Sequence, residues 1–224
     1  MFGNDFMRCA LGRVGLLLLL AVAGEAVASP DAASQVNMLC STAVKDVEGR
    51  LNIPAQLLSA ISLAESGRWD PMRGSNVSWP WTVYAEGHAH YAPDKQSAIA
   101  RVRTLKARGV RNIDVGCMQI NLYYHPDAFA SLNEAFDPAA NVAFAGALLR
   151  RLQNDHRSWS RAIAFYHSST RKYALPYMIR VQRLWLIEHR RAVVELRDER
   201  LEVLRLKKAE REANQAGTSK TASF

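Results

Sequence analysis

Apolar residues recur with a helical period between Ile53 and Asp70. Leu58, Ile61 and Glu65 fall at i, i+3 and i+7, and this spacing places all three on one face of a helix. We therefore predict a short helix in which a single carboxyl group, that of Glu65, lies on an otherwise apolar stripe near the C-terminal end.

The flanking residues suggest where this helix begins and ends. Asn52 is a plausible N-cap, and Pro54 suits a first helical position because its missing N–H would have no partner there. Gly67 can adopt the left-handed conformation that closes many helices.

The predicted position of Glu65 has a chemical consequence. Desolvation raises the pKa of a carboxyl group, and the negative end of a helix dipole acts in the same direction. A carboxyl group that holds its proton near neutral pH can act as a general acid. The alternative is an ordinary solvated glutamate, because a modest rotation of the helix would expose this side chain.

Apolar periodicity predicts a mainly helical fold with a small β-hairpin insertion. Residues 71–80 are rich in Pro, Gly, Ser and Asn, and this composition predicts a loop. Glu86-Gly87 resembles a turn between two short strands. The expected helices are 34–50, 94–108, 137–154, 158–166 and 173–189, and the expected strands are 81–84, 89–91 and 113–115.

Residues 1–28 have the features of a secretory signal peptide. Two arginines precede the apolar run Val14–Gly24, and Ala26-Val-Ala28 fits a small-x-small cleavage site. The apolar run is shorter than the ~20 residues needed to span a membrane, although an uncleaved anchor is the alternative. We therefore expect export to a periplasm, with no stable membrane span after signal cleavage.

The exported chain would retain two cysteines, Cys40 and Cys117. In an oxidising compartment such a pair often forms a disulfide, although two buried free thiols are the alternative. On the chain-entropy estimate, closing a loop of about 77 residues contributes up to about 4–4.5 kcal/mol.

The composition changes after residue 189. Residues 190–214 mix Arg, Lys and Glu with a narrow apolar seam, which predicts a long charged helix. This segment could dock back on the domain, pair with a partner helix or extend into solvent. The polar tail 215–224 is expected to be disordered, so the predicted catalytic domain is 29–189.

The net charge is basic, with 29 Lys and Arg against 21 Asp and Glu. This balance suits an anionic partner such as a cell-wall polymer, a membrane surface or nucleic acid, without choosing among them. A nucleic-acid binder is disfavoured by the predicted export and by the absence of a recognition motif.

A second block of interest is Asp114-Val-Gly-Cys-Met-Gln-Ile-Asn121. Gly116 and Cys117 are small enough to allow close backbone approach. The amides of Gln119 and Asn121 could hydrogen-bond hydroxyl or acetamido groups of a sugar. A polar turn between two elements is the alternative.

Three blocks in order resemble the lytic transglycosylases. They are Glu65-Ser66 at the end of an apolar helix, Gly116-Cys-Met-Gln-Ile-Asn121, and Ala162-Ile-Ala-Phe-Tyr-His-Ser-Ser169. The resemblance is to domains of the soluble-lytic-transglycosylase type, with a goose-type lysozyme-like fold, and it covers about residues 39–186. Residues 80–115 most resemble the members linked to conjugation and type IV secretion.

The resemblance implies cleavage of the β-1,4 bond between N-acetylmuramic acid and N-acetylglucosamine in peptidoglycan. Glu65 matches the single catalytic acid/base, and Ser66 matches the neighbouring serine that positions the substrate or the acid. The other matches are Met118, Gln119 and Asn121 in the groove-lining motif and Tyr166 as the tyrosine that borders the glutamate.

Two residues of the third block depart from the family pattern. His167 stands where the family usually has Asn, and Ser169 stands where it usually has Gly. These differences affect the contacts expected at that edge of the groove, but not the assignment of the acid.

A single carboxyl group implies a substrate-assisted reaction, since an ordinary glycosidase uses two. The product would be a 1,6-anhydro sugar, formed without a metal or cofactor. A zinc site at His88 and His90 is disfavoured because no third ligand has suitable spacing.

Two other readings remain open. A hydrolytic muramidase would need a second carboxylate, for which Asp70, Glu86 and Asp114 are candidates. A wall-binding scaffold would instead recruit secretion-system components through the charged C-terminal helix.

Overall fold

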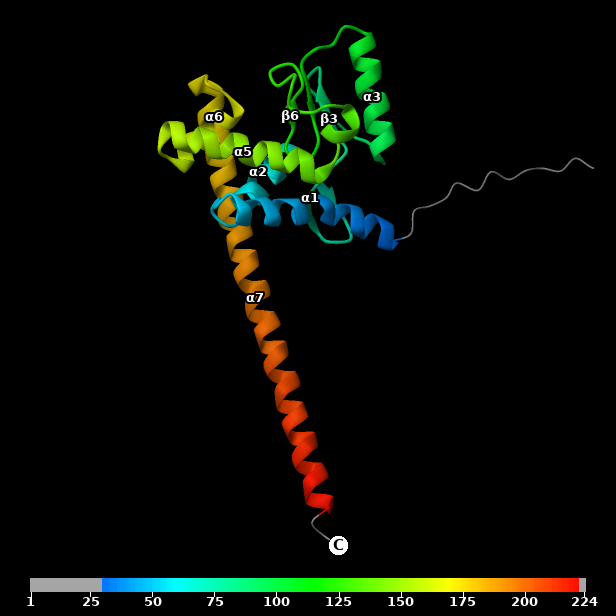
Figure 1. Cartoon of the computed structure of the whole chain (residues 1–224), viewed down its shortest axis with the longest axis vertical. Coiled ribbons are helices and arrows are strands. Elements are labelled where there is room, and N and C mark those ends of the chain that lie inside the picture. The colour runs from blue at the N-terminus through cyan, green and yellow to red at the C-terminus, as the bar shows by residue number, and fades with distance from the viewer. Residues whose placement is uncertain (1–29, 222–224) are drawn as a thin grey trace, which may run out of the picture.

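The computed structural model describes residues 30–221, and this part of the chain is mainly helical (Figure 1). The predicted signal peptide lies outside the described residues. The helices are α1 (Pro30–Arg50), α2 (Leu57–Ser66), α3 (Lys95–Ala107), α4 (Leu132–Ala135), α5 (Pro138–His156), α6 (Trp159–His167) and α7 (Arg171–Thr221). No helix within 30–221 is long and apolar enough to cross a bilayer.

The strands form two small antiparallel sheets. One is the hairpin of β1 (Gly67–Asp70) and β2 (Ser75–Ser78). The other has the order β4-β3-β5-β6 and is built from β3 (Thr82–Ala85), β4 (His88–Tyr91), β5 (Ile113–Val115) and β6 (Ile120–Asn121). The predicted β3–β4 hairpin and the strand at 113–115 are thus confirmed.

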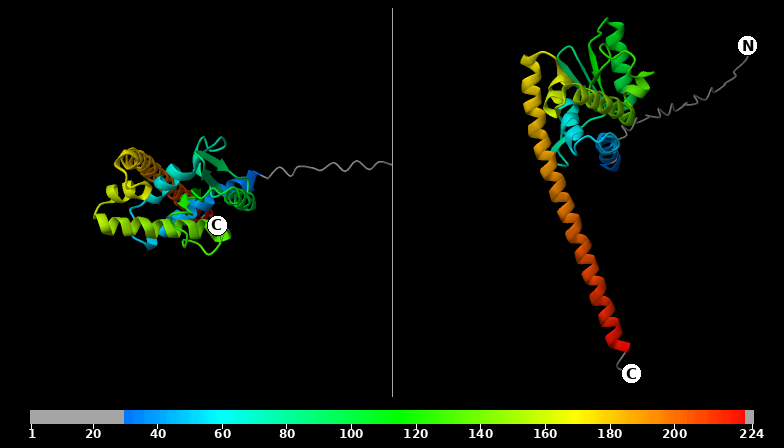
Figure 2. Two further views of the ribbon diagram at one scale, coloured as in Figure 1. Left: turned by 90° about the horizontal axis from the view of Figure 1, so that it is seen from above. Right: turned by 60° about the vertical axis from the view of Figure 1, so that its left-hand side comes forward.

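Two hydrophobic clusters form the core. The larger joins α1, α2, α5, α6 and the first part of α7, with Leu58, Ile61 and Leu149 fully buried. The smaller lies between the four-stranded sheet and α3, around Ile113 and Phe136. Views from other directions show the long α5 beside the other helices of the larger cluster and α3 beside the four-stranded sheet (Figure 2).

Local capping signals correctly predicted three helix starts. The carboxylate of Asp94 accepts a hydrogen bond from the Ser97 amide at 2.7 Å, and Asp137 caps α5 with Pro138 at its first position. The hydroxyl of Ser158 likewise accepts from the Arg161 amide. These residues satisfy amides that have no partner inside the helix.

The predicted start of α2 is wrong, whereas its predicted end at Gly67 is confirmed in position but not in conformation. Asn52 adopts a positive φ of 49° outside the helix, and α2 begins only at Leu57. The reason is a long-range cap: the Glu48 carboxylate of α1 accepts from the amides of Gln56 and Leu58 at 2.9 and 2.7 Å. Gly67 is extended rather than left-handed, and a Cβ there would clash with the Leu63 carbonyl oxygen.

The predicted loop at 71–80 contains the second strand of a hairpin. Gly67 pairs with Ser78 and Asp70 with Ser75, so β1 follows α2 with no intervening loop. Short polar strands rich in Ser and Asn resemble loops in sequence, and here they are recognisable only from their pairing.

Cys40 of α1 and Cys117 form a disulfide with a Cα–Cα distance of 5.7 Å, as the sequence predicted. Both residues are fully buried. The bond ties the N-terminal helix to the turn that precedes β6.

Two predicted segments merge into one helix. The helix expected at 173–189 and the charged helix expected at 190–214 are both part of α7, which continues to Thr221 (Figure 1). The tail expected to be disordered from 215 is therefore helical to 221. A helix that has already formed adds residues at little cost, so a polar composition alone does not end it.

Candidate active site around Glu65

Glu65 occupies the last turn of α2, beside Ile61 and Leu58. Its side chain is half-buried, whereas those two residues are fully buried. Burial raises the pKa of Glu65 from an ordinary 4.5 to about 7, and the negative charge of Asp114 acts in the same direction. A hydrogen bond from Tyr177 and the positive charge of Arg180 oppose this rise. The carboxyl group therefore keeps its proton in about half of the molecules near neutral pH.

Tyr177 of α7 is the direct partner of this carboxyl group. Its hydroxyl donates to Glu65 Oε1 at 2.5 Å, and its ring stacks on His167 with centroids 4.4 Å apart and planes 7° apart. Burial and the nearby Glu65 carboxyl raise the pKa of Tyr177 well above its usual value, so the hydroxyl stays protonated as a donor. A fixed donor orients the carboxyl group.

Sequence reasoning assigned Tyr166, not Tyr177, to the edge of the glutamate. In the structure the Tyr166 hydroxyl donates to the Met118 carbonyl at 2.9 Å. The charges of Glu65 and Asp114 nevertheless help raise the pKa of Tyr166, so its ring lies in the same neighbourhood. Tyr177 was missed because its spacing to Val181 matches a helix core face, the commoner role for such a residue.

The turn that carries Met118 is held by Asn141 of α5, which is fully buried. Its amide nitrogen donates to the carbonyls of Val115 and Ala135, both at 3.0 Å, and its oxygen accepts from the Met118 amide at 2.9 Å. Gly116 has a φ of 85°, and a Cβ there would clash with the Asn141 side chain. The turn therefore needs glycine for both conformation and space.

Two predicted substrate contacts are buried. Ser66 is fully buried, and its hydroxyl donates to the Cys117 carbonyl at 2.8 Å. Met118 is also fully buried and packs in the larger cluster. Neither side chain is accessible to a polymer in this structure. Ser66 joins α2 to the turn, and Met118 anchors that turn in the core.

Gln119 is half-buried and adopts a positive φ of 47°. Its Nε2 donates to the carbonyls of Thr82 and Gly116, at 3.1 and 2.9 Å, and these two acceptors fix the orientation of the amide. Within the described part of the chain, its Oε1 is buried without a hydrogen-bond partner. The amide is therefore held by its nitrogen alone, and its oxygen is not accessible from outside in this structure.

Asn121 holds the neighbouring carboxylate. Its Nδ2 donates to Asp114 Oδ1 at 2.6 Å, and its Oδ1 accepts from the amides of Tyr123 and Tyr124. Asp114 and Asn121 face each other across β5 and β6, and Tyr84 lies opposite Asp114 on β3. Directly paired residues share a face of the sheet, so Tyr84, Asp114 and Asn121 lie together opposite the buried face.

The three candidate second carboxylates have different surroundings. Asp70 is buried beside Arg73, and its Oδ1 accepts from the Met72 amide. Glu86 lies in an exposed turn and pairs with Arg108 at 3.0 Å. Asp114 alone of the three affects the Glu65 pKa, and burial raises its own pKa.

Neither a metal centre nor the polar cavity coincides with the Glu65 site among the described residues. Within residues 30–221, no group of three His, Cys, Asp or Glu side chains could hold a metal ion, and His88 and His90 lie exposed on β4. A polar cavity of about 110 Å³ is lined by residues that include Ser62, Arg73 and Glu188, but not by Glu65.

No protein-family model matches this chain, and neither a curated protein nor a solved structure is significantly similar to it. The site must therefore be interpreted from its own chemistry. It presents a half-buried carboxyl group that holds a proton near pH 7, a fixed hydroxyl donor and a second carboxylate on the facing sheet.

Proposed function

We propose that this chain is a lytic transglycosylase that cleaves peptidoglycan between N-acetylmuramic acid and N-acetylglucosamine. The observation that carries the proposal is the Glu65 carboxyl group, whose pKa of about 7 suits it to give and take a proton at neutral pH. The three sequence blocks that resemble this family supply the substrate class.

In the proposed reaction Glu65 protonates the glycosidic oxygen as the bond to the anomeric carbon breaks. The 2-acetamido carbonyl of the substrate stabilises the positive charge that develops at this carbon. Glu65, now ionised, accepts the proton of the muramic acid 6-hydroxyl. The 6-oxygen then attacks the anomeric carbon and forms the 1,6-anhydro ring without consuming water.

The surrounding residues support this sequence of steps. The Tyr177 hydroxyl stabilises the ionised state of Glu65 after it has given up its proton. In this proposal the half-buried Gln119 and Asn121 border the groove. The Asn121 side chain already bonds Asp114 and the amides of Tyr123 and Tyr124, so its role is to position the Asp114 carboxylate. In this proposal Ser66 and Met118 hold the turn at Cys117–Gln119 in place from its buried side and do not contact the glycan.

A hydrolytic muramidase is the second candidate, and one observation favours it. The Asp114 carboxylate is close enough to raise the pKa of Glu65, so the site holds the second carboxyl group that a hydrolytic glycosidase requires. In the transglycosylase reading, Asp114 instead helps keep the proton on Glu65.

Mass spectrometry of digested peptidoglycan separates the two reactions. The transglycosylase yields 1,6-anhydro muropeptides, and Asp114→Asn still yields them with a lower pH optimum because Glu65 loses a neighbouring negative charge. Reducing-end muropeptides from the wild type, together with loss of cleavage in Asp114→Asn, would identify a muramidase instead.

The assignment of the acid is tested by Glu65→Gln, for which we expect a loss of about 10²–10⁴-fold in the cleavage rate. Glu86→Gln is the matched control, because it makes the same change in an exposed turn. Unchanged cleavage by Glu65→Gln would refute the assignment. A wild type that binds sacculi but cleaves nothing would favour the scaffold reading.

A further inference from the structure

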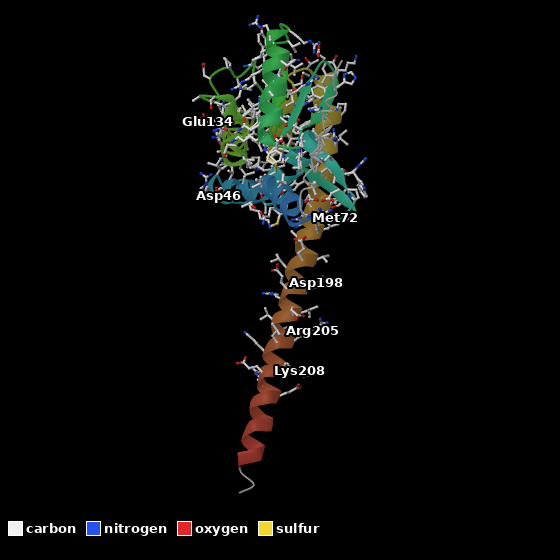
Figure 3. All side chains as sticks on the ribbon, turned by 90° about the vertical axis from the view of Figure 1, so that its right-hand side faces the viewer. Asp46, Met72, Glu134, Asp198, Arg205 and Lys208 are labelled. Carbon is white, nitrogen blue, oxygen red and sulfur yellow. A yellow bond between two sulfur atoms is a disulfide. The ribbon has the colours of Figure 1, made fainter. Side chains whose placement is uncertain are left out.

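The distal part of α7, from Arg190 to Glu212, carries exposed apolar side chains. Leu196, Val203 and Leu206 are 61%, 48% and 63% exposed. Figure 3 shows the labelled Asp198, Arg205 and Lys208 on a stretch of helix that no other element approaches. The helix therefore does not dock back on the domain, and its apolar residues have no partner among the described residues.

These apolar residues follow a heptad spacing. Leu196 and Val203 are seven residues apart, as a positions of a coiled coil would be. Ala192 and Leu206 then fall at d positions of the same seam. Glu199 and Glu210 occupy the remaining seam positions, so the seam is apolar but interrupted.

Charged residues border this seam with opposite signs on its two sides. Glu195 and Glu202 occupy the g positions on one side, and Arg200 and Lys207 occupy the e positions on the other. In a parallel pair of helices, a g residue of one chain faces the e residue five positions further along the other. Glu195 would thus face Arg200 of a second copy, and Glu202 would face Lys207.

The orientation of the pair follows from the same charges. In an antiparallel pair, g residues face g residues and e residues face e residues, which would place Glu against Glu and Arg or Lys against Lys or Arg. Like charges at these positions disfavour pairing. The charge pattern therefore complements a second copy only in the parallel arrangement.

A second apolar row is a weaker candidate. Ile187, Val194 and Leu201 are also seven residues apart and exposed. Arg190, Arg197 and Leu204 fall at the alternating seam positions of that row. A pair formed there would bring arginines of both copies together at two of these three positions.

We propose that the distal part of α7 is a self-association surface, through which two copies of this chain form a parallel coiled coil along Ala192, Leu196, Val203 and Leu206. The pairing is reversible, since it spans only about three heptads and Glu199 of each copy faces its counterpart. The proposal is independent of the reaction assigned to Glu65.

The test is a charge exchange measured by sedimentation of the full chain, expressed with its N-terminal segment so that any processing can occur. We expect the wild type to show a monomer–dimer equilibrium in the micromolar to submillimolar range. Glu195→Lys/Glu202→Lys should weaken the dimer by about tenfold or more, because four attractive contacts become repulsive. Arg200→Glu/Lys207→Glu should do the same.

Mixing these two double variants should restore association, since each g residue then again faces an opposite charge. Asp198→Lys/Glu212→Lys is the matched control: it makes the same change in net charge at outer positions and should leave the dimer intact. Glu199→Leu should tighten the dimer.

Three results would overturn the proposal. They are a wild type that stays monomeric over the whole range, dimers that resist both charge exchanges, and an absence of rescue on mixing. The first would indicate a different occupant for this surface, such as a partner helix or a membrane surface.

Discussion

The two halves of α7 belong to one continuous helix but differ in their relation to the rest of the molecule. In the first half, Tyr177 and Val181 are buried against the core, and the Trp185 indole donates to the Ala55 carbonyl at 2.8 Å. In the second half, Leu196 and Leu206 are exposed. One helix thus supplies a hydrogen bond to Glu65 at one end and an unpartnered surface at the other.

This difference shows that helix formation and docking are separate properties of the sequence. Alternating Glu, Arg and Lys favour a helix through i,i+3 and i,i+4 pairs, such as Arg205 with Glu202. A helix packs against a core through a continuous apolar face of aromatic and aliphatic side chains. The fold and the proposed site should therefore depend on the first half of α7 and not on the second.

The largest expected effect comes from removing the disulfide of the packed domain, to which the first half of α7 belongs. Cys40→Ser/Cys117→Ser should lower the free energy of unfolding by about 4 kcal/mol, because a loop of 77 residues is no longer closed in the unfolded chain. Denaturant unfolding with and without reductant measures this loss. An unchanged midpoint in both experiments would mean that the cross-link does not stabilise this region.

The second prediction concerns the stability cost of the Glu65 carboxyl group. Its folded-state pKa of about 7 exceeds the ordinary 4.5, so between these pH values the folded state holds more protons than the unfolded state. Stability therefore falls as pH rises through this window, by at most about 3 kcal/mol. Glu65→Gln removes the effect and should be more stable than the wild type at pH 8.

Denaturant midpoints at pH 4 and pH 8 test this prediction. The two proteins should be nearly equal at pH 4, and Glu86→Gln should follow the wild type at both pH values. A Glu65→Gln variant that is less stable than the wild type at pH 8 would argue against a raised pKa of Glu65 in the folded state.

A smaller effect is expected from Tyr177→Phe, which tests the first half of α7 alone. Loss of the donor leaves Glu65 Oε1 without this partner and should cost about 0.5–1.5 kcal/mol. Because this bond lowers the Glu65 pKa, its loss should move the alkaline limb of the pH–rate profile to higher pH. Tyr166→Phe is the control, since its hydroxyl bonds the Met118 carbonyl instead; an equal shift in both variants would refute a specific role for Tyr177.

The smallest effect is expected at the other end of the helix. Ending the chain after Ala192 should change the free energy of unfolding by less than about 0.5 kcal/mol and leave wall cleavage intact, because the described side chains that it removes, those of 193–212, are exposed. Calorimetry at low protein concentration, where self-association does not contribute, is the appropriate measurement. A large loss of stability would contradict the separation of the two halves.

Much of the fold was predictable because its signals are local. Asp94, Asp137 and Ser158 mark helix starts within three residues of the amides they cap, and Cys40 and Cys117 were the only cysteines left after the expected leader. The apolar stripe of α2 correctly placed Glu65 beside Leu58 and Ile61.

The remaining features depend on contacts between distant residues. The start of α2 is set by Glu48 in another helix, and Gly67 is needed for its distance from the Leu63 carbonyl rather than for a left-handed turn. The partner of Glu65 is 112 residues away, at Tyr177. No periodicity or spacing in the sequence encodes such pairs.

The most direct test of the central claim is the titration of Glu65 itself in the folded chain. Carbon-13 NMR of the glutamate carboxyl carbons, assigned by comparison with Glu65→Gln, gives its pKa without reference to any substrate. We predict a midpoint near 7, from burial opposed by the Tyr177 hydrogen bond. A midpoint near the unperturbed value of about 4.3 would contradict the proposal that the fold prepares this group as a general acid.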